Sequence, residues 1–597
     1  MARFHLCCDA HVHQRARTSS AESGLIECGA SDGTYIKVST YHKRNLYNKN
    51  FAEFGNGDYV AIVGTLIFNG ELGEFTLRPV YEKYIESGIE GVRSQAIGHY
   101  AVVIKYEDKV VIFGDPNGVY EVYYTTDKKF FVSNSLRLCS LMLQRRVLSK
   151  QNLLQRSLEI SEINNSTIFT NVRRLGAREC LVIDASRPTM GVKHASQPEP
   201  DWDYQDKPVE RVASDYTEQV KSVFKEIAAS TSSLGVQATG GLDSRSVLAG
   251  LLNNNSKPLV FYGVGNSPLT NTKDEDLEAA QTYASEFNLE FHKMNWGGEI
   301  PTDTCGWNTL FKKFGFRFTT YGATKNYFAS MKSENIPELM MSGYAYGTVS
   351  NTYYWEMDQL MPIKLEDVVE KHFSQTQNIT QNTYKRKSKY LDSLVHDCHS
   401  ALSDHGYNLE NKDRIQLNDF VTYIQLLNSR SQSSYVNLAN EFCYHIAPFA
   451  TFKLGRPMLD FSPKHRSGER VRIMVIKKLQ RALLDIPIYS GRKQAMINKE
   501  NKLVFVNPLD RLIGIFKENV PLSILKLAHP IYRRYIFDAK EISSYKELHR
   551  AYVHELHKSL LSRDFNFGNY NGDIRLLSRL ALYVHGLNQI GYDQIES

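Results

Sequence analysis

The chain of 597 residues is too long for one compact domain, and we expect about two or three. Its hydrophobic content of 42% and charged content of 23% are those of an ordinary globular protein. The formal net charge of +6 is small and the lysines and arginines are scattered, which argues against a nucleic-acid partner and permits an anionic ligand such as a nucleotide. Residues 1–17 lack the apolar core of a signal peptide, and no stretch approaches the roughly 18 apolar residues of a membrane span. We therefore expect a cytoplasmic protein without membrane insertion.

The cysteines form no Cys-x-x-Cys pair and have no metal-ligand spacing with histidine. This pattern predicts reduced thiols rather than a metal site or a disulfide framework. The eight residues are Cys7, Cys8, Cys28, Cys139, Cys180, Cys305, Cys398 and Cys443.

Short segments rich in Val, Ile, Tyr and Phe, separated by Gly, Asn and Asp, predict a β-rich first third of the chain. Three prolines and little apolar periodicity in residues 194–208 indicate an interdomain linker, which we place at 196–210. Before it we expect helices at 71–94 and 136–148, and strands at 59–68, 100–106, 109–114, 121–125, 129–133 and 179–185.

Beyond the linker the pattern alternates between strand and helix, which predicts an α/β fold with a parallel sheet and right-handed crossovers. From residue 365 onward the sequence is mostly helical, with amphipathic stretches at 414–427 and 470–484. The alternating elements are a helix at 209–230, a strand at 234–238, a helix at 243–252, a strand at 257–264 and a helix at 274–287.

The segment 234–245 has the features of a phosphate-binding loop. A predicted strand ends in Thr239-Gly240-Gly241, and a helix begins near Asp243. The glycines let the backbone approach a phosphate, and a helix N-terminus adds partial positive charge. The Thr239 and Ser244 hydroxyls can donate hydrogen bonds, and Asp243 can hold Mg²⁺. The alternative is an ordinary strand-to-helix turn capped by Asp243; the strand–loop–helix context favours phosphate binding.

These residues resemble a known family. The segment TGGLDS at 239–244 is similar to the SGGxDS pyrophosphate loop of the asparagine synthetase family. FYGVG at 261–265, the segment 276–284 and MSG at 341–343 resemble the family's next strand, helix and nucleotide-lining segment. The resemblance implies a PP-loop domain of the adenine-nucleotide α-hydrolase type at 211–597, with a helical C-terminal part. It also implies Mg²⁺ and ATP as cofactors, with ATP contacts from Ala238, Thr239, Gly240, Gly241, Leu242, Asp243, Ser244, Val264, Ser342 and Gly343.

The first part of the chain resembles the same family's glutamine amidotransferase domain, of class II. The similar segments are 98–104, 113–124, 131–135, 172–183 and Asn69-Gly70-Glu71. The resemblance implies an Ntn-hydrolase-like αββα sandwich at 1–195. Such domains attack glutamine with an N-terminal cysteine whose α-amine acts as base. Here the sequence reads Met1-Ala2-Arg3, and Cys7 and Cys8 are internal, so we expect this domain to lack glutaminase activity.

The missing nucleophile makes the chain similar in layout to β-lactam synthetases and lasso-peptide cyclases, which close a ring with the substrate's own amine. We therefore expect a ligase that forms AMP and diphosphate while it activates a carboxylate and makes an amide bond. The nucleophile is an amine or free ammonia; the carboxylate belongs to an amino acid, a peptide or a sugar acid, with a precursor peptide or a biosynthetic protein as further partner. The alternative is a non-catalytic relative that binds a nucleotide or serves as a scaffold.

Two departures concern the catalytic residues. In asparagine synthetases, SG is followed by E-G-S-D-E, whose Asp is a second Mg²⁺ ligand. Here Tyr344 replaces the first Glu and Gly347 replaces the Asp, which should weaken the metal site unless Glu356, Asp358 or a substrate compensates. β-Lactam synthetases use a tyrosine with a glutamate as general base, so Tyr344 has either that role or a packing role.

A lysine of the family stabilises transition-state charge in a segment of the form K-x-x-L-R. The sequence Lys477-Lys-Leu-Gln-Arg481 is similar, and we assign that role to Lys477. The alternative is a solvated lysine on an amphipathic helix.

Overall fold

The computed structural model describes most of the first 264 residues and parts of the rest. The described residues are 3–127, 129–149, 151–152, 164–187, 189–195, 207–264, 274–295, 304–316, 336–344, 365–366, 387–404, 433–490, 493–507, 587, 589–591 and 593–596.

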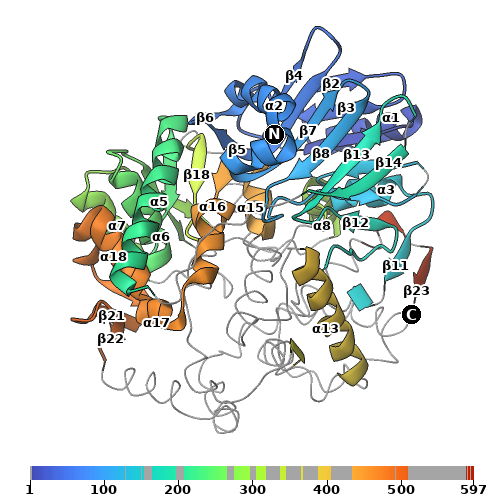
Figure 1. Cartoon of the computed structure of the whole chain (residues 1–597). Helices are drawn as coiled ribbons and strands as arrows, with labels where there is room; N and C mark the ends of the chain where they lie inside the picture. The colour runs from blue at the N-terminus through green and yellow to red at the C-terminus, as the bar shows by residue number, and fades with distance from the viewer. Residues whose placement is uncertain are drawn as a thin grey trace.

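Two antiparallel sheets make up the first part of the chain, which lies at the top of Figure 1. One sheet has the order β12-β9-β10-β1-β3-β2, and the other has the order β14-β13-β8-β7-β5-β4. The strands are β1 (Arg3–Cys7), β2 (Glu27–Asp32), β3 (Lys37–Tyr41), β4 (Phe51–Glu53), β5 (Tyr59–Phe68), β6 (Glu71–Leu72), β7 (Ile97–Tyr106), β8 (Lys109–Gly114), β9 (Tyr123–Thr125), β10 (Phe131–Ser133), β12 (Val172–Arg174), β13 (Glu179–Asp184) and β14 (Thr189–His194).

The two sheets pack face to face with helices outside them. Inward side chains of β1 and β3 share one apolar cluster with those of β5, β7, β8 and β13. Helices α1 (Ala10–Glu22) and α3 (Leu136–Met142) cover the outer face of the first sheet, and α2 (Leu77–Gln95) covers that of the second. The layer order is therefore helix, sheet, sheet, helix. Successive side chains of a strand point to opposite faces, so each sheet packs against the other sheet on one face and against helices on the other.

The second part contains a parallel sheet, so the predicted mixed α/β class is confirmed. Its order is β17-β16-β15-β18-β19, and every pairing in it is parallel. The strands are β15 (Leu234–Gln237), β16 (Leu259–Val264), β17 (Phe291–Asn295), β18 (Leu339–Met341) and β19 (Tyr444–Ile446).

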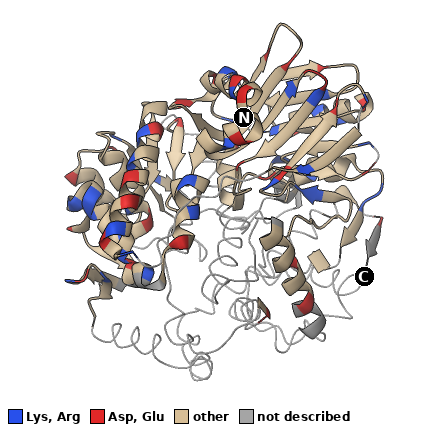
Figure 2. Cartoon of the chain, in the orientation of Figure 1, with Lys and Arg blue, Asp and Glu red and all other residues tan. Residues whose placement is uncertain are grey.

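Helices α5 (Val209–Ser230), α6 (Leu242–Leu252) and α18 (Arg470–Gln480) pack on one another beside this sheet, and α7 (Asp274–Glu286) contacts β16 and β17 (Figure 1). Helix α5 buries Val212, Tyr216, Val220, Val223 and Ile227, a spacing of three to four residues that places one apolar stripe against the core. Figure 2 shows acidic and basic residues interspersed on these helices.

Three predicted helices were wrong in extent. The segment 71–94 begins as β6 and a 3₁₀ turn, η1 (Gly73–Thr76), because Asn69 and Gly70 take positive φ and close a β5–β6 hairpin. The segment 136–148 ends as a helix at Met142 and continues into β11 (Val147–Ser149), which pairs in parallel with β23 (Gln594–Glu596). In the segment 470–484, α18 ends at Gln480 and η5 (Arg481–Leu484) follows as a 3₁₀ turn.

The remaining described elements lie mostly toward the C-terminus. A small antiparallel sheet of β20 (Ile488–Ser490), β21 (Lys493–Ile497) and β22 (Leu503–Phe505) has no counterpart among the predicted elements. The helix expected at 414–427 lies outside the described residues. The others are α8 (Thr304–Phe314), α13 (Lys387–Asp404), α15 (Ser433–Ala439), η2 (Pro448–Ala450), α16 (Phe452–Gly455), η3 (Arg456–Asp460), α17 (Pro463–Arg466) and η4 (Ser467–Glu469).

A buried polar interface joins the sandwich to strand β19. Lys43 Nζ donates to the carbonyl of Asn440 at 2.7 Å, and Thr65 Oγ1 donates to Asn440 Oδ1 at 2.7 Å. His99 Nε2 lies 3.2 Å from the carbonyl oxygen of Ala447. These groups are almost fully buried, so their hydrogen bonds satisfy polar atoms that water does not reach. Within the part of the chain that the structure describes, each helix falls short of the length and apolarity that crossing a bilayer requires.

Candidate functional site

The predicted phosphate loop and the predicted nucleotide-lining segment meet at one place in the sheet. Strand order reverses between β15 and β18, because the chain proceeds from β15 to β16 on one side and later to β18 on the other. Loops that follow two such strands leave a crevice at their carboxyl ends, where ligands bind in open parallel sheets. The loop 238–241 follows β15, and Ser342 and Gly343 follow β18.

Three amides of the loop are used inside the protein. Thr239 N donates to Ser244 Oγ at 3.0 Å, and Gly241 N donates to Thr239 Oγ1 at 3.3 Å. Gly240 N donates to Asp276 Oδ1 at 2.8 Å. A phosphate that binds the Gly240 amide must therefore displace the Asp276 carboxylate of α7. Sequence analysis did not predict this contact between Asp276 and Gly240.

Close packing explains two of the glycines. A Cβ at Gly343 would lie 2.5 Å from the carbonyl carbon of Asp243 and from Ser244 N, so the two loops touch backbone to backbone. A Cβ at Gly240 would lie 2.7 Å from a ring carbon of Tyr489. At Gly241 the same atom would lie 3.4 Å from Thr239 Oγ1 and 3.9 Å from the carbonyl oxygen of Tyr489, both ordinary contacts.

The predicted Mg²⁺ ligand, Asp243, forms an ion pair. It lies in the first turn of α6, and its carboxylate accepts a hydrogen bond from Nη1 of Arg472 on α18. The other terminal nitrogen, Nη2, is 3.0 Å from Glu469 Oε2. Arg472 is 3% exposed and Asp243 is 45% exposed. Desolvation raises the pKa of Asp243 and the guanidinium opposes that shift; because water reaches the carboxylate, we take it as ionised at neutral pH.

A second arginine ties the loop to the segment after α18. The buried Arg245 donates to the carbonyl oxygens of Ile486 and Pro487, each at 2.8 Å, and of Gly240 at 3.1 Å. Tyr489 N also donates to the Gly240 carbonyl, at 3.0 Å. The position of Gly240 is therefore fixed by the chain segment 486–489.

The other predicted ATP contacts lie around this crevice. Ser342 is 2% exposed, its amide donates to the Ile446 carbonyl at 3.1 Å, and its hydroxyl has no hydrogen-bond partner among the described residues. A buried hydroxyl in that state is available to a ligand. Ala238 and Leu242 are buried, and Val264 is half-buried at the end of β16.

Tyr344 follows directly after Gly343. Its ring packs edge-on against Tyr435, with 4.8 Å between the ring centroids, and Tyr435 in turn contacts His445 at 5.4 Å. Burial raises the pKa of Tyr344 to about 12, so the neutral phenol dominates at physiological pH. Gly347, Glu356 and Asp358 lie outside the described residues.

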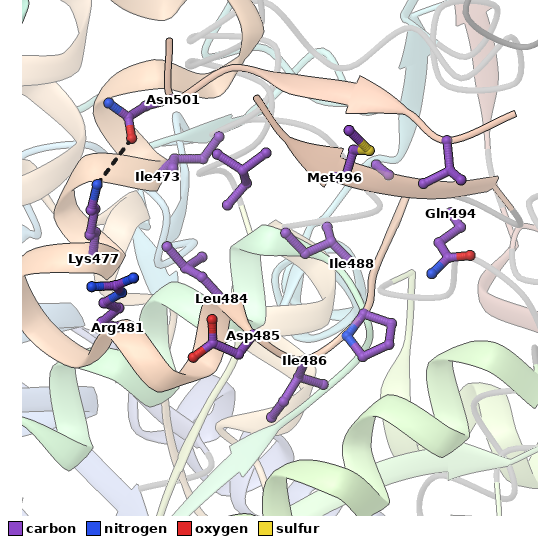
Figure 3. Close-up of a pocket in the computed structure, with 14 residues that line it drawn as sticks. Ile473, Lys477, Arg481, Leu484, Asp485, Ile486, Ile488, Gln494, Met496 and Asn501 are labelled. Carbon is purple, nitrogen blue, oxygen red and sulfur yellow. Dashed lines mark hydrogen bonds between the residues drawn. The ribbon is translucent and has the colours of Figure 1, made fainter. Parts of the chain in front are cut away.

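The structure places Lys477 away from the loop. Its Nζ lies 3.4 Å from Asn501 Oδ1, and its side chain lines a pocket that includes no residue of 238–244 (Figure 3). Arg472 and Lys477 are five residues apart on α18, which turns their side chains about 140° from each other. The cation that contacts Asp243 is thus Arg472, which sequence reasoning missed although it lies on the same predicted helix.

The structure offers limited support for a metal site. In the described ranges no three His, Cys, Asp or Glu side chains are placed to hold an ion together. Asp243 as Mg²⁺ ligand stays a prediction. The groups around the crevice are mostly hydrogen-bond donors: the hydroxyls of Thr239, Ser244 and Ser342, and the start of α6, which has no side-chain cap. Donors of this kind suit an anionic nucleotide better than a bare cation.

The thiols nearest the start of the chain are poorly suited to nucleophilic attack. Cys7 lies on β1, is fully buried, and burial raises the pKa of its thiol to about 12. Cys8 is half-buried, and burial raises its pKa as well. The thiolate is the reactive form of cysteine, so both thiols are unreactive at neutral pH. Asn69 and Gly70, predicted as a remnant of a glutamine pocket, form the β5–β6 turn beside α5.

No protein-family model and no curated protein sequence matches this chain. Among solved structures, one match is a glutamine phosphoribosylpyrophosphate amidotransferase from B. subtilis complexed with ADP and GMP, at 12% identity and a TM-score of 0.25. It covers 49% of this chain, which spans 65% of that enzyme's length. Another match is an allosteric regulatory enzyme of purine biosynthesis, at 10% identity and a TM-score of 0.24, covering 70% of this chain and 93% of that one. Neither of these proteins is described as an asparagine synthetase, and TM-scores this low establish no shared function.

Proposed function

We propose that the chain is an ATP-dependent amide ligase, which activates a carboxylate by adenylation and releases AMP and diphosphate. The observation that supports this most is the meeting of two loops at the reversal of strand order. Gly343 packs against the backbone of Asp243 and Ser244 there, beside the buried Ser342 hydroxyl, for which the described residues supply no hydrogen-bond partner. The ligand chemistry that fits this crevice is a nucleotide phosphate group.

In this proposal the loop amides, the Thr239 and Ser244 hydroxyls and Ser342 bind ATP. Asp243 would hold Mg²⁺, which neutralises phosphate charge when bound. Arg472 supplies a fixed positive charge next to Asp243, which would offset phosphate charge where Gly347 replaces the family's second carboxylate ligand and Mg²⁺ is held less tightly. Asp276 releases the Gly240 amide when phosphate binds.

We propose that residues 1–195 keep an Ntn-hydrolase-like sandwich without glutaminase chemistry, joined by 196–210 to the synthetase part at 211–597. The layer order of helices and sheets supports the first half of this proposal. The raised pKa values of the buried Cys7 thiol and the half-buried Cys8 thiol support the second. The nucleophile is then free ammonia or an amine of the substrate, and the product is an amide or a lactam of a small carboxylate, a sugar acid or a peptide.

Tyr344 acts either as a general base near the reacting carbonyl or as a packing residue. A general base needs a pKa near the working pH, whereas burial raises that of Tyr344 to about 12. The packing role against Tyr435 is therefore favoured.

The decisive experiment is ATP–pyrophosphate exchange across a panel of carboxylates: amino acids, uronic acids and short peptides. Exchange that depends on one class of carboxylate supports the proposal and names the substrate class. Asp243→Ala should abolish this exchange, while Glu218→Ala, an exposed carboxylate on α5, should leave it unchanged. Unchanged exchange in Asp243→Ala would rule out the mechanism.

The second candidate is a nucleotide-binding or scaffold protein without catalysis. Two contacts favour it: Asp276 accepts from the Gly240 amide, and Arg472 engages Asp243. Saturable ATP binding, with no exchange for any carboxylate, would decide for this candidate.

A further inference from the structure

A cavity of about 440 Å³ is lined in part by residues 486–488, the segment that is hydrogen-bonded to Arg245. Its walls come from α18 and η5 on one side and from the small sheet β20–β22 on the other (Figure 3). A volume of this size suits one small organic molecule.

The cavity has a cationic side and an apolar side. Lys477 and Arg481 line it together with one carboxylate, Asp485. Figure 3 shows these side chains at one end of the cavity, while Met496 and Ile488 lie toward the other. The apolar lining consists of Ile473, Leu484, Ile486, Pro487, Ile488, Ala495, Met496, Ile497 and Val506.

Two large apolar side chains at this cavity face solvent. Met496 is 46% exposed and Val506 is 47% exposed, and both are among the few large hydrophobic residues with that exposure in the described part of the chain. Both side chains also line the cavity, so they add apolar surface at its rim. The turn that carries Asn501, which Lys477 contacts, is held by backbone hydrogen bonds from Asn498 to Lys502 at 2.9 Å and from Asn501 to Asn498 at 3.1 Å. The cavity wall therefore has a defined shape before any ligand binds.

We propose that this cavity binds a small organic anion with an apolar body, such as an aromatic or branched-chain carboxylate or sulfonate. Lys477 and Arg481 bind the anionic group, and the Ile486–Ile488 and Met496 side chains cover the body. The proposal does not depend on the proposed function, because it needs no nucleotide. Residues 486–488 form one wall of the cavity, and Arg245 hydrogen-bonds both to this segment and to the Gly240 carbonyl. In this proposal a bound molecule therefore also restrains the loop at Gly240.

The test uses 8-anilinonaphthalene-1-sulfonate, a fluorescent anion with an apolar body, titrated into the full chain. Lys477→Gln combined with Arg481→Gln should weaken binding by about fivefold or more, because two charges that face the anion are lost. Met496→Glu places a negative charge at the rim and should weaken binding as well. Lys478→Gln is the matched control: Lys478 is exposed on the same helix and does not line the cavity.

Affinities within about twofold of the wild type in both the double variant and Met496→Glu would overturn the proposal. A second readout locates the probe directly. Amide hydrogen exchange should slow in 483–490 and in 238–244 when the probe is saturating. Unchanged exchange in 483–490 would place the probe elsewhere and likewise overturn the assignment.

Discussion

The guanidinium of Arg472 on α18 pairs with the carboxylate of Asp243 on α6, across 229 positions of sequence. Arg472 is 3% exposed and is held from the other side by Glu469, so its charge stays beside the phosphate loop. Arg472→Gln should lower ATP–pyrophosphate exchange by about 10²-fold, the effect of losing one fixed transition-state donor. Lys477→Gln should change it by less than about threefold, because Lys477 lines a different cavity. The reverse order of effects would return the catalytic role to Lys477.

The backbone contact at Gly343 predicts a matched pair of glycine variants. Gly343→Ala puts a methyl group within 2.5 Å of backbone atoms in α6, and should lower the free energy of unfolding by about 1–3 kcal/mol and weaken ATP binding. Gly241→Ala meets only ordinary contacts and should have little effect on stability. Urea titration and calorimetric ATP binding measure both effects. Equal losses in the two variants would contradict this reading of the loop.

Tyr344→Phe separates the two roles of that residue. Because the pKa of Tyr344 is raised to about 12, we expect amide formation and pyrophosphate exchange both to stay within about fivefold of the wild type. Tyr344→Ala removes the ring from Tyr435 and should lower both half-reactions. A loss of about 10²–10⁴-fold in amide formation alone, in Tyr344→Phe, would instead identify a general base.

Burial of Lys43 at the interface between the sandwich and β19 predicts that the free energy of unfolding depends on pH. Its pKa is lowered from 10.5 to about 7, so between these values the unfolded chain binds more protons at this site than the folded one. Lys43 therefore destabilises the fold most below about pH 7, and that cost is relieved as pH rises. Relative to Lys43→Met, the wild type should gain about 1.4 kcal/mol in free energy of unfolding per pH unit above 7. Urea titrations at pH 7 and 8.5 check this, with Lys221→Met, on the surface of α5, as a control that shows no such slope.

The buried thiols predict an absence of glutaminase activity in the purified protein. Glutamine should release no glutamate, and Cys7→Ser and Cys8→Ser should leave any ligase activity unchanged. Alkylation of Cys7 by iodoacetamide should be slow because the thiol is both buried and protonated. Glutamate release that the Cys7→Ser variant abolishes would refute the assignment.

The parallel sheet was predictable because each of its early strands is a short apolar run followed by an amphipathic helix. The predicted strand at 234–238 and helix at 209–230 differ from β15 and α5 by at most one residue. Strand β11 was not predictable, since 147–149 becomes a strand through pairing with 594–596 and a bridge to Phe169, contacts that are distant in the sequence. The strand-to-helix turn at 239–244 was likewise predictable, and phosphate binding by it stays a prediction.

Contacts between side chains on different helices and loops could not be predicted from the sequence. The sequence places Arg472 and Lys477 on one helix, and only tertiary packing decides which of them faces Asp243. The contact of Asp276 with the Gly240 amide depends likewise on how α7 packs, which local pattern does not encode.

Strand β19 is covered by side chains from the two-sheet part of the chain. Strand β19 is an edge of the parallel sheet, and an open edge is a template for pairing with other chains. Here the outward amide of His445 donates to Thr65 Oγ1 at 2.8 Å, and the amide of Ala447 donates to His99 Nε2 at 3.3 Å. Side chains of β5 and β7 thus end the sheet where a neighbouring molecule would otherwise extend it. Among the described residues, the sandwich therefore covers the edge of β19 at which another strand would otherwise pair.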